Sequence, residues 1–254
     1  MQRELVEAIV ATGTPTVLVL LTGRPYALGA VKDRAAAIVQ AFFPGEEGAG
    51  AVAGVLSGRV NPSGRLPVSV PNTPGGSPAT YLHAQLGGKS GISSADPTPA
   101  FPFGHGLSYT SFSLDGLQVA GADGAATEEL ATDGSVTVSV EVRNTGERDG
   151  AQVVQLYLHD PVASVVRPVK QLAGFARVEL AAGATARVSF ALHADRTSFT
   201  GRDLTRIVES GDLVLQVGTS SEDLPLQSTV RVTGPERVVG VDRVLTTPVE
   251  VTAL

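Results

Sequence analysis

The sequence predicts two unlike folds in one chain: the C-terminal part of an α/β domain, followed by a complete antiparallel β-sandwich of immunoglobulin type. In the first region, two apolar runs, at 16–21 and 36–43, alternate with helical patterns, and the first run is rich in β-branched residues. In the second, valines occupy every other position from Val136 to Val142, the pattern of a half-buried strand. A stretch crowded with Pro, Gly and Ser separates the two regions.

The composition is that of a globular protein with room for two domains. The chain has 254 residues, of which 43% are hydrophobic and 17% are charged, enough apolar material to form real cores. Its formal net charge is −6 and no block of Lys and Arg interrupts it, which argues against a nucleic-acid partner. Without cysteine, it has neither disulfides nor a thiolate metal site.

Residues 1–75 show the helix and strand alternation of a parallel sheet. The expected order is a helix at 4–10, a strand at 16–21, a strand at 36–43, a helix at 46–56 and a short extended stretch at 66–70. Two central strands leave open edges and uncovered faces, which isolated domains avoid. The first helix also has nothing before it to pack on. We therefore expect residues 1–75 to be the C-terminal part of a larger domain.

Residues 76–111 are expected to form an ordered interdomain loop, since so long an irregular segment in a compact protein usually has a role. Within it, the stretch 101–110 holds three aromatic residues, two glycines and a histidine. The simpler interpretation is a plug whose rings pack between the two domains. The alternative is that His105 or Tyr109 borders a ligand site.

Residues 112–233 are predicted to form the sandwich, with about seven strands separated by turn signals. The expected strands are 112–119, 135–143, 153–159, 170–180, 186–192, 213–219 and 228–232. The tail, 234–254, has no clear period, and we expect it to run back over a neighbouring domain.

No catalytic constellation is visible in the sequence. The segment from Gly45 to Gly50 lacks the Lys-Ser/Thr ending of a phosphate loop, and two acidic residues already occupy the helix start. Glu46 and Glu47 are adjacent, so on a helix they point in different directions and cannot face one sugar. The four histidines lack metal-ligand spacing. We predict no catalytic residue, no cofactor and no metal site.

A carbohydrate-binding role for the sandwich stays open as an alternative to a scaffold. Sugars usually stack on exposed aromatic rings, and the chain has no Trp. Few aromatic residues fall within the sandwich, and most of them are at positions that alternate inward, which favours the scaffold.

Targeting signals are absent from the sequence. Arg3 and Glu4 follow the initial methionine closely, and the apolar run 17–21 is far shorter than the roughly 20 residues that span a bilayer. We expect no signal peptide and no membrane partner; the compartment is unknown, with the cytoplasm favoured.

Taken together, the motifs resemble family 3 glycoside hydrolases, the β-glucosidase and β-xylosidase group. Segments similar to the second, α/β-sandwich domain of that family are TPTVLVLLTGRP at 14–25, FPGEEG at 43–48 and NPSGRLP at 61–67. The stretch 101–110 resembles its passage into a fibronectin type III-like domain, whose own motifs are similar to VVQLYL at 153–158 and QLAGF at 171–175. The stretches 81–84 and 193–203 look more like bacterial β-xylosidases.

The resemblance implies a retaining glycosidase acting on xylo- or gluco-oligosaccharides. Its nucleophile would be an Asp on an N-terminal barrel, and its acid/base a Glu early in the second domain; neither has a counterpart here. Glu47 matches the Pro-Gly-x-Glu-Gly position, where we expect it to orient a loop at the barrel interface. The resemblance thus implies a C-terminal fragment, inactive alone, with Glu47, His105 and Tyr109 as candidates to border the substrate. The remaining alternative is that this chain complements a barrel that is encoded as a separate protein.

Overall fold

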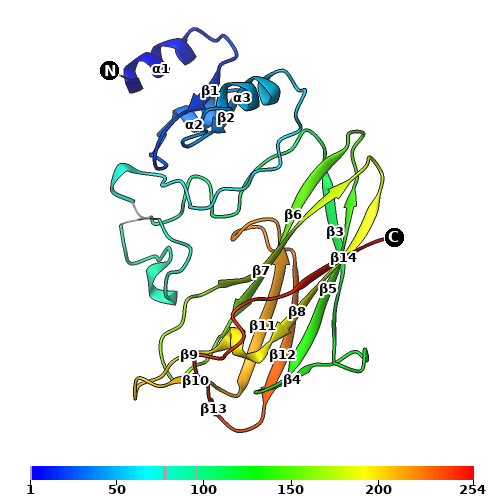
Figure 1. The fold of residues 1–254 in the computed structure, drawn as a ribbon. Coiled ribbons are helices and arrows are strands. Elements are labelled where there is room, and N and C mark those ends of the chain that lie inside the picture. Colours follow the sequence, from blue (N-terminus) through cyan, green and yellow to red (C-terminus); the bar gives the residue numbers. More distant parts are fainter. Residues whose placement is uncertain (1, 77–78, 95) are drawn as a thin grey trace.

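The computed structural model describes residues 2–76, 79–94 and 96–254, and it has two parts (Figure 1). The N-terminal part is a small group of helices around two strands, and the C-terminal part is a long sandwich. An extended loop region connects them; residues 77, 78 and 95 of the predicted interdomain loop lie outside the described residues. The α/β plus all-β fold class is therefore confirmed.

The N-terminal part contains both predicted strands and both predicted helices. Its elements are α1 (Gln2–Ala11), β1 (Val17–Leu20), α2 (Val31–Arg34), β2 (Ala37–Gln40) and α3 (Gly48–Leu56). β1 and β2 pair in parallel, with Val17 opposite Ala37. The single turn α2 escaped prediction, because its four residues include three charged side chains and show no apolar period. Two strands make an incomplete sheet, as the sequence indicated.

The extended stretch predicted at 66–70 pairs with the interdomain loop and not with the small sheet. Val70 N donates to Phe101 O at 2.8 Å, and Leu66 N donates to His105 O at 2.9 Å. Two 3-10 turns, η1 (Pro74–Gly76) and η2 (Gln85–Gly87), lie in the loop between these partners. The loop thus returns antiparallel to the chain that precedes it, which gives both segments backbone partners.

The sandwich has two sheets of antiparallel strands with one parallel edge pair. The five-stranded sheet has the order β4-β12-β11-β6-β7. The four-stranded sheet has the order β14-β8-β5-β3, where β14 is the C-terminal strand Val249–Ala253. The strands are β3 (Phe112–Ala120), β4 (Glu129–Ala131), β5 (Ser135–Asn144), β6 (Gly150–His159), β7 (Gln171–Leu180), β8 (Thr185–His193), β11 (Gly211–Gly218) and β12 (Leu226–Thr233). All seven predicted strands are present; β4, of three residues, is additional.

The core of the molecule lies between these two sheets. Val138 and Val142 of β5, Leu156 of β6 and Phe190 of β8 are completely buried there. Burial of each such side chain stabilises the fold by about 1.5–3 kcal/mol relative to exposure. The alternation seen in the sequence of β5 is therefore the inward face of the four-stranded sheet.

The expectation that residues 234–254 run over a neighbouring domain was wrong. β14 (Val249–Ala253) pairs antiparallel with β8 and closes that edge of the four-stranded sheet. β13 (Arg237–Val238) pairs with β10 (Arg206–Val208), which also pairs with β9 (Phe199–Thr200). The tail thus supplies hydrogen-bond partners for strand edges that would otherwise be open. In the ranges that the structure describes, no helix has the length and apolarity needed to cross a bilayer.

Candidate functional site

The stretch 101–110 lies along the seam between the two parts of the molecule and contacts both. On one side it pairs with residues 66–70, since Gly104 N donates to Leu66 O at 2.8 Å. On the other side, Ser221 N of the sandwich donates to Phe103 O at 2.9 Å. The aromatic-rich stretch 101–110 of the interdomain loop therefore forms the joint between the two parts.

Three aromatic rings from distant parts of the chain meet in this joint. Tyr81 stacks on Phe103 with ring centroids 4.4 Å apart and packs edge-on against Tyr157 at 5.9 Å. Tyr157, on β6, is completely buried and its hydroxyl donates to Gln155 Oε1 at 2.7 Å. Burial raises the pKa of Tyr157, so that its hydroxyl remains a neutral donor.

Gln155 connects the joint to the sandwich through its side-chain amide. Its Nε2 donates to Gly104 O at 3.2 Å and to Thr219 O at 2.5 Å. The residue is 2% exposed, so each of these bonds is shielded from water. Gly104 has φ +81°, a conformation that leaves its carbonyl available to the amide and that favours glycine.

The Asn61 side chain connects the C-terminal end of the stretch 101–110 to the sandwich. Its Nδ2 donates to Asp149 O of the sandwich at 2.8 Å, and its Oδ1 accepts from Ser108 Oγ at 2.8 Å and Tyr109 N at 2.7 Å. One side chain thus holds the loop before β3 and the start of β6 together.

We expect Asn61→Ala to lower the free energy of unfolding by about 2–3 kcal/mol, because it removes three hydrogen bonds and leaves their partners poorly paired. Urea unfolding followed by circular dichroism measures the change. Asn72→Ala is the matched control, since among the described residues the Asn72 side chain makes no hydrogen bond. Equal losses in the two variants would contradict the role assigned to Asn61.

His105 packs within the joint. Its ring stacks on Phe101 with centroids 5.4 Å apart, and its backbone pairs with Leu66 and Pro102. Burial and the nearby Arg65 guanidinium lower the pKa of His105, against an opposing influence of Asp223. The imidazole is therefore neutral at pH 7, as suits a ring held between the two parts.

Tyr109 spans from the joint to the helical part. Its hydroxyl donates to Val55 O of α3 at 2.8 Å, and the Arg148 guanidinium lies over its ring at 5.5 Å. The residue is 44% exposed. Tyr109 thus connects α3 with the sandwich, a positioning role that fits the interpretation of the stretch as an interdomain plug.

Glu47 lies apart from the joint. It occupies the N-cap of α3, is exposed, and makes no side-chain capping bond. The Val55 carbonyl that Tyr109 binds lies eight residues further along the chain, or about 12 Å at the rise of an α-helix. The structure therefore does not bring Glu47 together with Tyr109; that any of the three candidate residues borders a substrate stays a prediction.

Asn61, Tyr81 and Gln155 are the residues of the joint that sequence reasoning missed. Gln155 carried a signal, because it is polar within the otherwise apolar run 153–158. Asn61 and Tyr81 lie in the segments 61–67 and 81–84 that carry the family resemblance, but the sequence did not indicate which contacts their side chains make. Among the residues that the structure describes, no group of three His, Asp or Glu side chains is arranged to hold a metal ion.

Comparison with protein families places both parts of the molecule. Residues 1–109 match the glycosyl hydrolase family 3 C-terminal domain. Residues 152–221 match the fibronectin type III-like domain. The first match includes α1, the small sheet and the whole joint up to Tyr109. The domain limits at residues 75, 111 and 233 stay predictions.

Two curated relatives cover most of this chain. A β-xylosidase of Formosa agariphila is 42% identical over 224 residues, which is 87% of this chain and 30% of the relative. A periplasmic β-glucosidase of Salmonella typhimurium is 40% identical over 230 residues, 87% of this chain and 29% of the relative. The chain therefore spans about 30% of the length of these relatives.

Solved structures agree with this assignment. A β-glucosidase from Listeria innocua in complex with glucose superposes with a TM-score of 0.83 at 34% identity, covering 92% of this chain and 33% of that one. A β-glucosidase from Erythrobacter marinus gives a TM-score of 0.83 at 39% identity, covering 91% and 30%. The incomplete sheet and the complete sandwich thus occur together in longer proteins.

Proposed function

Because this chain belongs to glycoside hydrolase family 3, we propose that it is the C-terminal, structural portion of a β-glycosidase that removes terminal β-linked xylose or glucose from oligosaccharides. In this role, the chain holds the surface of its α/β part in a fixed position beside a catalytic barrel. The joint at 101–110 connects that surface to the sandwich, through the bond from Gln155 to Gly104 and the bond from Tyr109 to Val55.

The observation that carries this proposal is the contrast between the two parts. The sandwich encloses its own core, whereas among the described residues 2–66 only Val10 and Val31 are buried hydrophobic side chains. Leu21, directly after β1, is 62% exposed, and Phe43, three residues after β2, is 81% exposed. Parallel sheets are normally covered on both faces. These side chains suit contact with further strands and helices of a larger domain.

The carboxylates of the chain also favour a structural role. A retaining glycosidase needs two carboxyl groups about 5–5.5 Å apart across the sugar. Glu46 and Glu47 are neighbours at the start of α3 and both are exposed to solvent. We infer that the nucleophile is supplied by a barrel and the acid/base by an earlier part of the α/β domain, and that Glu47 orients the loop beside the barrel.

We expect the purified chain to give no turnover of aryl β-xyloside or aryl β-glucoside. Mixing it with the N-terminal portion of a family 3 β-xylosidase, itself inactive without its C-terminal portion, should restore release of the aryl group. A colorimetric assay of both substrates measures the outcome, and the better substrate indicates the sugar.

The variant Glu47→Gln distinguishes a structural role of Glu47 from a catalytic one. If Glu47 only orients a loop, the variant reduces the restored activity by about tenfold or less, and the chain alone stays inactive. Turnover by the chain alone that disappears in Glu47→Gln would overturn the structural role. Failure to restore activity with any family 3 barrel would contradict the proposal that this chain functions beside such a barrel.

A further inference from the structure

Four loops form a row along one side of the molecule, and they comprise residues 81–86, 162–168, 201–205 and 239–245. The first three lie along the left side of the view in Figure 1, below the N-terminal part. Val169 N, directly after the second loop, donates to His83 O of the first at 3.0 Å. Arg202 Nε of the third donates to Ser164 O of the second at 3.0 Å. Hydrogen bonds thus join the interdomain loop to two neighbouring loops of the sandwich.

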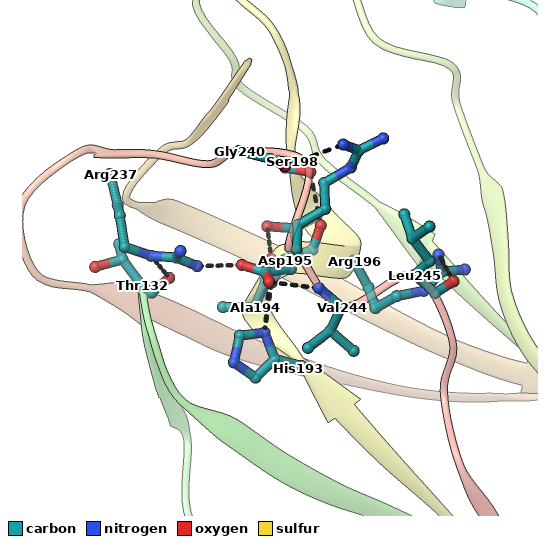
Figure 2. Close-up of polar contacts among 12 residues, drawn as sticks. Thr132, His193, Ala194, Asp195, Arg196, Ser198, Arg237, Gly240, Val244 and Leu245 are labelled. Atoms are coloured by element: carbon teal, nitrogen blue, oxygen red, sulfur yellow. Dashed lines mark hydrogen bonds and ion pairs between the residues drawn. The ribbon is translucent and has the colours of Figure 1, made fainter.

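The fourth loop adjoins the third and is bonded to the body of the sandwich (Figure 2). Val239 N donates to Arg206 O, directly after the third loop, at 2.9 Å. Val244 N donates to the Asp195 carboxylate of η3 (Ala194–Thr197) at 2.8 Å, and the same carboxylate pairs with the Arg237 guanidinium. The row of loops therefore extends from the interdomain loop to the C-terminal segment that leads into β14.

Each of the four loops carries at least one aliphatic residue that is almost fully exposed to solvent. Five such residues are 81–99% exposed, namely Leu86, Val162, Val166, Leu204 and Val241. Single exposed aliphatic residues are common on protein surfaces, whereas several of them on adjoining loops are typical of an interaction surface. We call these five residues the aliphatic patch.

Leu204, in the third loop, is held in a backbone conformation that leucine rarely adopts, with φ +65°. The turn around it fixes this conformation, since Gly201 N donates to Thr205 O at 2.8 Å and Leu204 N donates to Gly201 O at 3.2 Å. Backbone strain of this kind persists only where the surrounding structure over-determines it, and it is frequent at functional positions. Because Leu204 is exposed, burial within this chain does not compensate the strain, which favours a contact with a partner.

Two observations favour the missing barrel as the partner that covers the aliphatic patch. The patch begins at Leu86 in the interdomain loop, which follows directly on the α/β part that is assigned above to the barrel side. A contact at the patch would therefore continue the contact of the α/β part. This chain also spans about 30% of the length of its curated relatives, so most of their length lies outside the matched fold. A body of that size is large enough to reach all four loops.

We propose that the aliphatic patch docks on an aliphatic surface of the catalytic barrel, so that the sandwich contacts the barrel directly as well as through the α/β part. This inference rests on the proposed function, because it takes the barrel as the partner. Removal of the five exposed side chains from water drives the contact. The bonds between the loops hold these side chains in place before the barrel binds, which reduces the entropy that is lost on association.

Binding of the full chain to the part of the Formosa agariphila β-xylosidase that precedes the matched residues tests this contact. The wild-type chain should bind that part, measured by isothermal titration calorimetry, and the pair should release the aryl group from aryl β-xyloside. We expect the double variant Val166→Asp/Leu204→Asp to bind at least about tenfold more weakly, because a carboxylate loses its hydration in an aliphatic contact. Aspartate tolerates positive φ better than leucine, so this variant should fold as well as the wild type, which urea unfolding checks.

Leu254→Asp is the matched control, because it places the same charge at an exposed aliphatic position outside the patch. Leu254 is 60% exposed and its N donates to Thr185 O at 3.0 Å, at the start of β8. β8 ends at His193, next to η3, so the whole length of this strand separates Leu254 from the fourth loop. This variant should bind the barrel part as tightly as the wild type does.

Equal affinity of the wild type and the double variant for the barrel part would overturn the docking surface and leave the proposed function standing. Failure of the wild type itself to bind or activate any family 3 barrel part would contradict the proposed function, and the docking with it. Light scattering after size-exclusion chromatography of the chain alone tests the other occupant. A dimer that the double variant dissociates would assign the patch to a second copy of this chain and overturn the contact with the barrel.

Discussion

Replacing Gly104 by alanine is expected to lower the free energy of unfolding by about 3–5 kcal/mol and to loosen the two parts of the molecule from each other. An added Cβ would overlap the Gln155 amide, whose Cδ and Nε2 would both lie 2.9 Å from it. The residue also has φ +81°, which L side chains rarely adopt. Relief of the overlap would displace Gln155 from its bond with Thr219, so the change reaches into the sandwich.

Urea unfolding gives the loss of stability, and limited proteolysis of residues 79–94 reports the loosening. Gly124→Ala is the control for backbone strain, because Gly124 has φ +79° and no atom within 4 Å of its would-be Cβ. We expect it to cost only about 1 kcal/mol. If the two alanine variants lose the same stability, the contact between Gly104 and Gln155 does not hold the joint.

The sandwich could be predicted from the sequence because its central strands carry local patterns. Val136, Val138, Val140 and Val142 alternate with polar residues, and all four are buried in the structure. β14 carries no such pattern, since each of its five residues is exposed. β14 forms because it pairs with the open edge of β8, more than 50 residues earlier in the chain. Such a long-range pairing gives no local pattern in the sequence of β14.

The joint between the two parts was likewise predicted only in part. Its aromatic composition predicted an ordered plug, and the ring of Phe103 does stack on Tyr81, which packs edge-on against Tyr157 of the sandwich. The partners that make the joint specific, Asn61 and Gln155, lie between 47 and 88 residues along the chain from the atoms that they bind across it. Such contacts depend on the tertiary fold, so a single sequence indicates at most that a buried polar residue needs a partner.

Replacing Asp195 by asparagine is expected to cost about 3–5 kcal/mol at pH 7, because Arg237 then keeps its charge in a partly buried position without its anion. Asp212→Asn is the matched control. Asp212 pairs with Arg231 at 2.7 Å on the surface, with 54% of its side chain exposed, and such pairs contribute about 0–1 kcal/mol. Urea unfolding of the two variants measures the difference; similar losses would contradict the role of Asp195.

The effect of Asp195→Asn should depend on pH, with a sign fixed by the carboxylate. Burial alone would raise the pKa of Asp195, but the bonds from Arg237 and Val244 N outweigh it and the pKa is lowered. A lowered pKa means that Asp195 stabilises the fold above the pKa of the unfolded chain, about 4, and that this contribution disappears as the pH falls through the folded pKa. The difference between wild type and Asp195→Asn should therefore shrink steadily below about pH 4. Unfolding measured at pH 7, 4 and 3 tests this; a difference that stays constant across the three values would exclude the ionised carboxylate as the group that holds the C-terminal segment.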